Sequence, residues 1–86
     1  MSTRINLFGA LREADPRGYV ELELPAGSTI AALREALVAH LATHAPAVSA
    51  GLVRRCAFAT DDEILHNHRI VPEGVTLAVL PPVSGG

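Results

Sequence analysis

The spacing of apolar residues changes between residues 19 and 41, and this change constrains the fold more than any other feature of the sequence. In residues 19–24, YVELEL, valine and leucine alternate with glutamate, as in a strand that buries one face and leaves the other in water. Beyond the break at residues 25–27, PAG, apolar residues recur at intervals of three and four, at Ile30, Leu33, Leu37 and Leu41. A helix with one apolar stripe has to cover one face of a sheet, so the sequence predicts a two-layer α+β fold.

Turn residues divide the rest of the chain into short segments. Residues 4–8, RINLF, form a predicted first strand, and residues 15–18, DPRG, a turn before the alternating strand. Ser28 or Thr29 is the expected N-cap of the helix, which ends near Pro46. Three more strands, the second of them short, are expected at residues 53–58, 63–65 and 75–80. The predicted fold is therefore a mixed sheet with one main helix packed across one face.

Composition and charge narrow the classes of function. The chain has 86 residues, 49% of them hydrophobic and only 3% aromatic, which suits one small domain with an aliphatic core. Nine acidic and seven basic residues give a net charge of −2, which argues against nucleic acid as a partner. The first residues lack the apolar run of a signal peptide, and no stretch approaches the roughly 20 apolar residues of a membrane span. One cysteine cannot form an internal disulfide, which fits a reducing compartment. Together with the lack of a signal peptide and of a membrane span, this leads us to expect a cytoplasmic protein that has no membrane partner.

Histidine and cysteine residues offer other chemistry, and each has a simpler interpretation. His40 and His44 have the spacing of two metal ligands on a helix, and His66 and His68 could add more, but no acidic residue or cysteine completes a motif. We therefore expect no metal site and solvent-facing histidines. Cys56 follows two arginines, which could lower its thiol pKa, although strand alternation equally allows a small buried residue. No glycine-rich phosphate loop follows a strand, so we expect this chain to have no ATP site.

The residues after the last predicted strand, PPVSGG, are the strongest functional signal. Two terminal glycines alone are typical of a disordered end. Behind a strong strand and the stiff pair Pro81-Pro82, they instead form an arm that reaches at most about 20 Å when extended. A carboxylate becomes reactive when condensation with ATP gives an acyl adenylate, and glycine presents it without a side chain that would block a narrow active site. We therefore expect Gly85 and Gly86 to belong to a reactive arm.

Two segments carry a resemblance to a known family. Residues 5–13, INLFGALRE, and residues 77–86, LAVLPPVSGG, together with Thr29-Ile30, resemble the MoaD/ThiS family of ubiquitin-like sulfur carriers. The resemblance covers essentially the whole chain and implies a β-grasp domain over residues 1–80 with an extended tail over residues 81–86. It further implies that a partner activating enzyme uses ATP to adenylate Gly86, and that the product is a C-terminal thiocarboxylate.

The resemblance also implies partners and a pathway. It is nearest to the family members that supply sulfur for molybdenum cofactor biosynthesis, where the large catalytic subunit of molybdopterin synthase receives the tail in a heterotetramer. The chain would then bind no cofactor and would catalyse nothing by itself. Three alternatives stay open: a ubiquitin-like modifier that forms isopeptides through Gly86, a carrier for thiamine or cysteine formation, and a non-covalent interaction module with an inert tail.

The β-grasp arrangement predicts a docking surface, because its first and last strands lie side by side and parallel. By alternation, one set of side chains should face the helix, namely Ile5, Leu7, Val75, Leu77 and Val79. Phe8, Ala78 and Leu80 should then form an apolar patch on the opposite face, leading into the tail. We expect partners to contact this patch and the tail residues Pro81, Pro82, Val83, Ser84 and Gly85.

Overall fold

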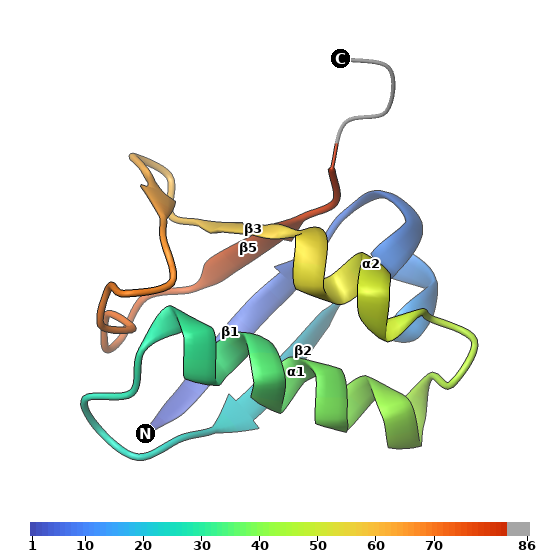
Figure 1. Ribbon diagram of the computed structural model, residues 1–86, viewed down its shortest axis with the longest axis horizontal. Coiled ribbons are helices and arrows are strands. Elements are labelled where there is room, and N and C mark those ends of the chain that lie inside the picture. The colour runs from blue at the N-terminus through green and yellow to red at the C-terminus, as the bar shows by residue number, and fades with distance from the viewer. Residues whose placement is uncertain (83–86) are drawn as a thin grey trace.

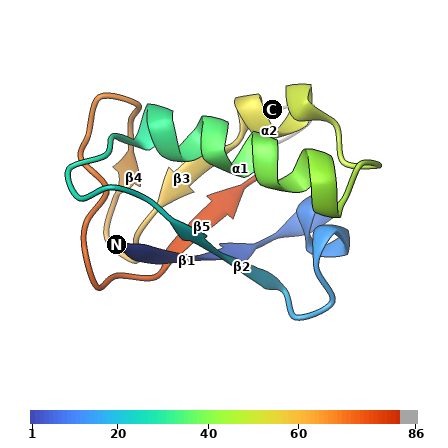
Figure 2. The same cartoon turned by 90° about the horizontal axis from the view of Figure 1, so that it is seen from below.

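The fold is a mixed five-stranded sheet with two α-helices on one of its faces (Figure 1, Figure 2). The computed structural model describes residues 1–82, and within this range the strands follow the spatial order β2-β1-β5-β3-β4. In chain order the elements are β1 (Ser2–Leu7), the 3-10 helix η1 (Gly9–Ala14), β2 (Tyr19–Glu23), α1 (Ile30–His44), α2 (Ala50–Arg55), β3 (Ala57–Ala59), β4 (Ile64–Leu65) and β5 (Leu77–Leu80). The predicted α+β class, with a mixed sheet and one main helix across one face, is confirmed.

The first and last strands form the centre of the sheet. β1 pairs with β5 in parallel, with Ile5 opposite Leu77 and Leu7 opposite Val79, and it pairs with β2 in antiparallel orientation. These four side chains are at most 2% exposed and belong to the same core cluster as the apolar stripe of α1. The parallel pairing and the orientation of these four residues toward the helix therefore agree with the prediction.

Helix α1 begins and ends where local signals place it. Thr29 is the N-cap, and its Oγ1 accepts a hydrogen bond of 3.2 Å from the Ala32 amide. The helix ends at His44, shortly before Pro46, because the position before a proline disfavours helical backbone angles. Its predicted stripe is buried in the core: Ile30, Leu33, Leu37 and Leu41. In the part of the chain that the structure describes, neither α1 nor α2 has the length and apolar character needed to cross a membrane.

The turn before β2 is also as predicted. The Gly18 amide donates a hydrogen bond of 3.0 Å to the Asp15 carbonyl and closes the turn. The Arg17 side chain donates two further hydrogen bonds, of 3.0 and 2.9 Å, to the Asp15 carboxylate. Because these bonds stabilise the ionised carboxylate, they lower the pKa of Asp15 to about 2.

The segment after α1 differs from the prediction. Residues 53–55, expected to begin the third strand, form the end of α2, and β3 is confined to Ala57–Ala59. Ser49 caps the short helix, since its Oγ accepts a hydrogen bond of 3.1 Å from the Leu52 amide. Val53 is buried in the core from a helix instead of a strand. A short apolar run fits either structure, which is why periodicity alone gave the wrong one here.

The last strand is shorter than predicted. β5 begins at Leu77, because the turn at Glu73-Gly74 is followed by two residues outside the ladder, and Gly74 has a φ of +71°. Val75 is 40% exposed and lines a hollow on the sheet face opposite the helices, which Ala78 also lines. The expectation that Val75 faces the helix is therefore wrong, because strand alternation does not extend back to it.

Arg34 of α1 connects the helices to the sheet. Its Nη1 donates hydrogen bonds to the carbonyl of Arg54, at 3.2 Å, and to the carbonyl of Cys56, both at the end of α2. Its Nε and Nη2 donate to Oδ1 of Asn67, at 3.1 and 3.0 Å. The guanidinium also lies over the Phe58 ring, 5.0 Å from its centroid. One side chain thus joins α1, α2, β3 and the loop after β4.

We expect Arg34→Met to lower the free energy of unfolding by about 2 kcal/mol or more, because even a single hydrogen bond from a charged donor contributes roughly 1.5–3 kcal/mol. Arg54→Met is the matched control, since Arg54 forms an ion pair with Glu35 in which both side chains are more than half exposed, and such pairs contribute little. Urea unfolding of the two variants measures the difference. Equal midpoints would show that Arg34 does not hold these elements together.

Candidate functional site

The candidate site is the edge of the sheet where β1 and β5 both end (Figure 1). Parallel strands run in the same direction, and Leu7 lies opposite Val79. The residues that follow β1, Phe8 and Gly9, therefore reach the same edge as Pro81, which follows β5. This edge is where the chain leaves the sheet toward the tail.

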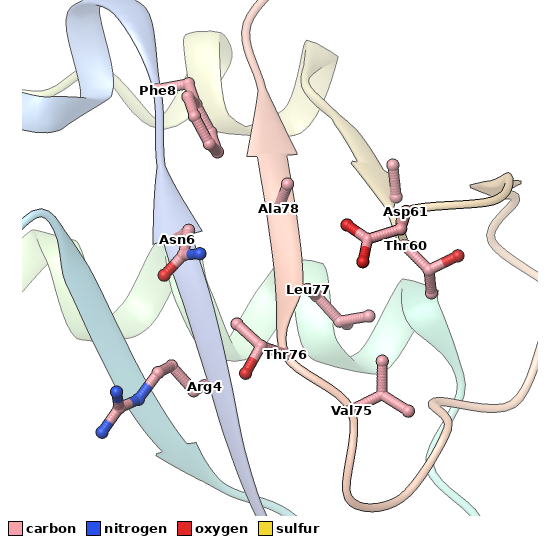
Figure 3. A pocket seen from close by; sticks show the side chains of 10 residues that line it. Arg4, Asn6, Phe8, Thr60, Asp61, Val75, Thr76, Leu77 and Ala78 are labelled. Carbon is pink, nitrogen blue, oxygen red and sulfur yellow. The ribbon is translucent and has the colours of Figure 1, made fainter.

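Phe8 occupies the junction between β1 and η1. Its backbone is extended, with φ −130° and ψ 158°, and it is the N-cap of η1, an element that the sequence analysis missed. The Leu11 amide donates a hydrogen bond of 3.2 Å to the Phe8 carbonyl, and the Leu11 side chain is fully buried. Leu11 is the one buried residue that anchors this short helix in the core. One buried residue gives no apolar periodicity from which the helix could be predicted. The Phe8 side chain stays 43% exposed, on the sheet face opposite the helices, as expected (Figure 3).

Gly9 and Pro81 approach each other closely where the two strands leave the sheet. Gly9 has a φ of +59°, in the left-handed region. A Cβ atom placed on Gly9 would lie only 2.7 Å from Cγ of Pro81. The proline ring therefore packs against the bare Cα of Gly9, and Pro81 is half-buried while Pro82 is exposed.

Small side chains lie at the centre of the open sheet face. The register places Asn6 of β1 beside Ala78 of β5, Ala78 beside Ala59 of β3, and Ala59 beside Ile64 of β4. Because side chains alternate along a strand, this row points away from the core, which receives Phe58 and Val79 instead. Two adjacent alanines at the centre of the row leave the face hollowed.

The hollow has a volume of about 480 Å³ (Figure 3). Phe8, Ala78 and Val75 form an apolar diagonal across it. Polar side chains lie on either side of this diagonal: Arg4, Asn6, Thr60, Asp61 and Thr76. Apolar contact area inside a polar rim is the usual anatomy of a protein–protein interface.

Arg4 is fixed at the rim of the hollow by two contacts. Its Nη2 donates a hydrogen bond of 3.1 Å to Oε1 of Glu21. Its guanidinium stacks on the Tyr19 ring, 4.1 Å from the ring centroid. The rim therefore presents an ordered cation on the β2 side, while Asp61 supplies a carboxylate on the β3 side.

The structure brings together only part of the predicted patch. Phe8 and Ala78 line the hollow, whereas Leu80 does not and is half-buried on the same strand face, nearer the tail. The polar rim was missed, although the alternation of Arg4, Asn6 and Phe8 in RINLF is a signal that could have found its β1 side. The remaining predicted site residues lie outside the described residues: Val83, Ser84, Gly85 and Gly86.

Cys56 is a core residue. Its side chain is 3% exposed, and its Sγ donates a hydrogen bond of 3.1 Å to the Leu52 carbonyl. Burial raises the pKa of the thiol, and the positive charges of Arg34 and Arg55 only oppose this effect. Of the two interpretations of the sequence, the small buried residue is therefore the correct one.

The histidines form two separate pairs. The rings of His40 and His44 stack with their centroids 4.1 Å apart, and Nδ1 of His44 lies 2.9 Å from the His40 carbonyl oxygen. Burial, and then the neighbouring His44, lower the pKa of His40. The rings of His66 and His68 are 6.5 Å apart. Among residues 1–82, no three side chains of His, Cys, Asp or Glu come together as metal ligands.

Comparison with known proteins gives one consistent result. The model of the ThiS family matches residues 5–86. The molybdopterin synthase sulfur carrier subunit of Synechococcus elongatus is 35% identical over 92 residues, an alignment that spans 100% of both chains. The crystal structure of SAMP1 from Haloferax volcanii has a TM-score of 0.73 at 25% identity and covers 100% of both chains. The structure of H. volcanii small archaeal modifier protein 1 has a TM-score of 0.72 at 20% identity, over 95% of this chain and 98% of that one. The predicted ubiquitin-like β-grasp fold is therefore confirmed.

We expect Cys56 to react with a thiol reagent such as DTNB at least about 100-fold more slowly in the folded protein than in denaturant, because labelling of a buried thiol requires local opening. Absorbance of the released thiol follows the reaction. A Cys56→Ala, Ile70→Cys variant is the control, because Ile70 is 56% exposed and a thiol there should react at once. Fast labelling of Cys56 in the folded chain would contradict its place in the core.

Proposed function

The chain belongs to the ThiS family of ubiquitin-like sulfur carriers, and from this membership we propose that it is the sulfur carrier subunit of a molybdopterin synthase. The observation that carries the proposal is the similarity, over the whole of both chains, to a relative that bears this name. In this proposal residues 1–80 are the folded domain and residues 81–86 are an arm that delivers Gly86. The chain itself is non-catalytic and donates sulfur within a larger complex.

The proposed chemistry proceeds in two steps at the Gly86 carboxylate. A partner activating enzyme condenses the carboxylate with ATP, which forms an acyl adenylate and releases pyrophosphate. Sulfide then attacks the acyl carbon and displaces AMP, which leaves a thiocarboxylate. ATP is bound by the partner, so this chain requires no cofactor of its own. The large catalytic subunit of the synthase then accepts the tail, and the thiocarboxylate sulfur bonds to the pterin precursor. Water then cleaves the acyl–sulfur bond and restores the Gly86 carboxylate.

We further propose that both partners dock on the open sheet face. A partner has to hold the domain while the tail enters its active site, so the docking surface should adjoin the tail. The hollow meets this condition, because Phe8 lines it and is followed directly by Gly9, which contacts Pro81. The two small residues Ala59 and Ala78 leave room for one protruding side chain of a partner, and Arg4 and Asp61 offer opposite charges at the rim.

A second candidate function is protein modification through an isopeptide bond at Gly86. The similarity to SAMP1 of H. volcanii, at 25% identity over both whole chains, favours it, since a second structure from that organism is named a small archaeal modifier protein. All seven basic residues of this chain are arginines. A lysine isopeptide would therefore join Gly86 to a different protein and not to a second copy of this chain.

Intact mass separates the two functions. The protein is incubated with ATP, a sulfur source and an extract of the organism from which it comes, and its mass is compared with a sample that lacks ATP. A gain equal to the exchange of one oxygen for sulfur identifies the thiocarboxylate. Conjugates of much higher mass that depend on ATP would favour the modifier instead.

We expect deletion of Gly86 to abolish thiocarboxylate formation, because it withdraws the carboxylate by about 3.5 Å, one residue of extended chain. A displacement of about 1 Å from reacting geometry can already cost on the order of 100-fold in rate. Gly85→Ala keeps the carboxylate in place and adds one methyl group, so it should slow the reaction without abolishing it. The free energy of unfolding of both variants should lie within about 0.5 kcal/mol of that of the unsubstituted protein, as is usual for surface substitutions. Full sulfur transfer by the shortened chain would refute the carrier function.

We expect Phe8→Ala to weaken binding to the large synthase subunit by about 10-fold, because aromatic side chains at the centre of interfaces often contribute 1–2 kcal/mol or more. Ile70→Ala is the control, since Ile70 is a large side chain that is 56% exposed but does not line the hollow. Isothermal titration calorimetry measures both affinities. Equal binding by the two variants would place the docking surface elsewhere.

A further inference from the structure

The contact between Gly9 and Pro81 joins the two parallel strands just beyond their last paired residues. Gly9 is the first residue of η1, two positions after Leu7, and Pro81 stands two positions after Val79, the strand partner of Leu7. A Cβ atom on Gly9 would lie 2.7, 3.6 and 4.0 Å from Cγ, Cδ and Cβ of Pro81. The ring that begins the tail thus rests on a surface that only glycine provides.

Two separate constraints act on Gly9, and other glycines of the chain allow them to be told apart. Its backbone φ of +59° is a value that residues other than glycine and asparagine rarely adopt. Gly18, Gly27 and Gly74 share this property, with φ between 71° and 86°, but a Cβ atom on any of them would meet nothing within 4 Å. Gly9 is therefore the one glycine among residues 1–82 that combines positive φ with a close contact.

This contact sets the direction in which the tail begins. Proline has a fixed φ and a rigid ring, so Pro81 cannot rotate its side chain out of the way as a flexible residue could. A side chain at position 9 would have to displace the ring from 2.7 Å to an ordinary separation of 3.4 Å or more, and the start of the tail would move with it. Every later residue of the tail is attached through Pro81, so the displacement changes the place from which the tail starts relative to the open sheet face.

We propose that Gly9 is a positioning residue for the acyl transfer reactions of the tail, and that it acts by seating the Pro81 ring. The inference rests on the proposed carrier function, because it assumes that the carboxylate of Gly86 is the reacting group. Gly9 does not contact the reacting atoms. It fixes the line along which the arm leaves the docking face, so that a partner bound at Phe8 and Ala78 receives the carboxylate at a fixed place.

The test uses Gly9→Asn with Gly18→Asn as its matched control. Asparagine tolerates positive φ, so both variants carry a similar backbone cost, but only the first adds a Cβ atom against Pro81. Thiocarboxylate formation is measured by intact mass with the activating enzyme from the same genome, ATP and sulfide, over a range of carrier concentrations. We expect kcat to fall about 10-fold or more in Gly9→Asn with KM nearly unchanged, because the docking face is intact and the carboxylate is misplaced. Gly18→Asn should keep both constants.

A double variant links the effect to the ring. Pro81→Ala removes Cγ and Cδ, the two closest atoms, and keeps Cβ, which lies at 4.0 Å from the added carbon. Pro81→Ala alone should lower kcat, because the tail loses its seat and its fixed φ. Gly9→Asn combined with Pro81→Ala should be no slower than Pro81→Ala alone, since the added side chain then has nothing to displace. Thermal unfolding of all four variants checks that they are folded, and the double variant and Pro81→Ala still test the proposal if Gly9→Asn does not fold.

The outcomes are distinct. Equal kcat for Gly9→Asn and Gly18→Asn, or effects of Gly9→Asn and Pro81→Ala that simply multiply in the double variant, would overturn the role of Gly9 and leave the carrier function intact. A rise in KM with kcat unchanged would mean that Gly9 serves docking, and this result would also overturn its proposed role as a positioning residue. If the unsubstituted chain forms no thiocarboxylate under the same conditions, the carrier function fails, and this inference fails with it.

Discussion

The parallel pairing of β1 with β5 is the interaction on which the rest of the structure depends. It joins the two ends of the domain at the centre of the sheet and places Ile5, Leu7, Leu77 and Val79 side by side in the core. Parallel neighbours need a long crossover, and here the intervening chain supplies β2, both α-helices and the remaining strands. Because parallel strands end at the same edge, the pairing also brings the residues after β1 beside the beginning of the tail.

The two faces of the sheet have different roles. One face is aliphatic and is covered by α1 and α2, which Arg34 connects to each other and to β3 (Figure 2). The other is open, with small residues at its centre, Phe8 near the tail and charged side chains at its rim (Figure 3). This division suits the carrier function that we propose. In that proposal, a rigid core holds the docking face in shape, and the tail carries the reactive group to a partner that supplies the active site.

Much of this organisation could be predicted from the sequence, and the failures have a common cause. The strand at residues 19–23 and the stripe of α1 were predicted correctly because several residues in succession repeat one period. Val53 and Val75 were misplaced because each lies in a short apolar run beside a turn, where a strand, a helix and a loop are equally compatible with the pattern. The open face was predicted through Phe8 and Ala78, but its hollow depends on Ala59 and Ala78 being adjacent across strands, which alternation within one strand does not specify.

The sequence by itself determined the elements that repeat a period, the cap of α1 at Thr29, the aliphatic core and the membership of the ThiS family. Only the tertiary structure decided that Cys56 is buried and that Gly9 supports Pro81. The physical reason is the range of the interactions. Periodicity and capping act between residues a few positions apart and can be read from adjacent letters, whereas the contact of Gly9 with Pro81 exists only because two strands from opposite ends of the chain share one register.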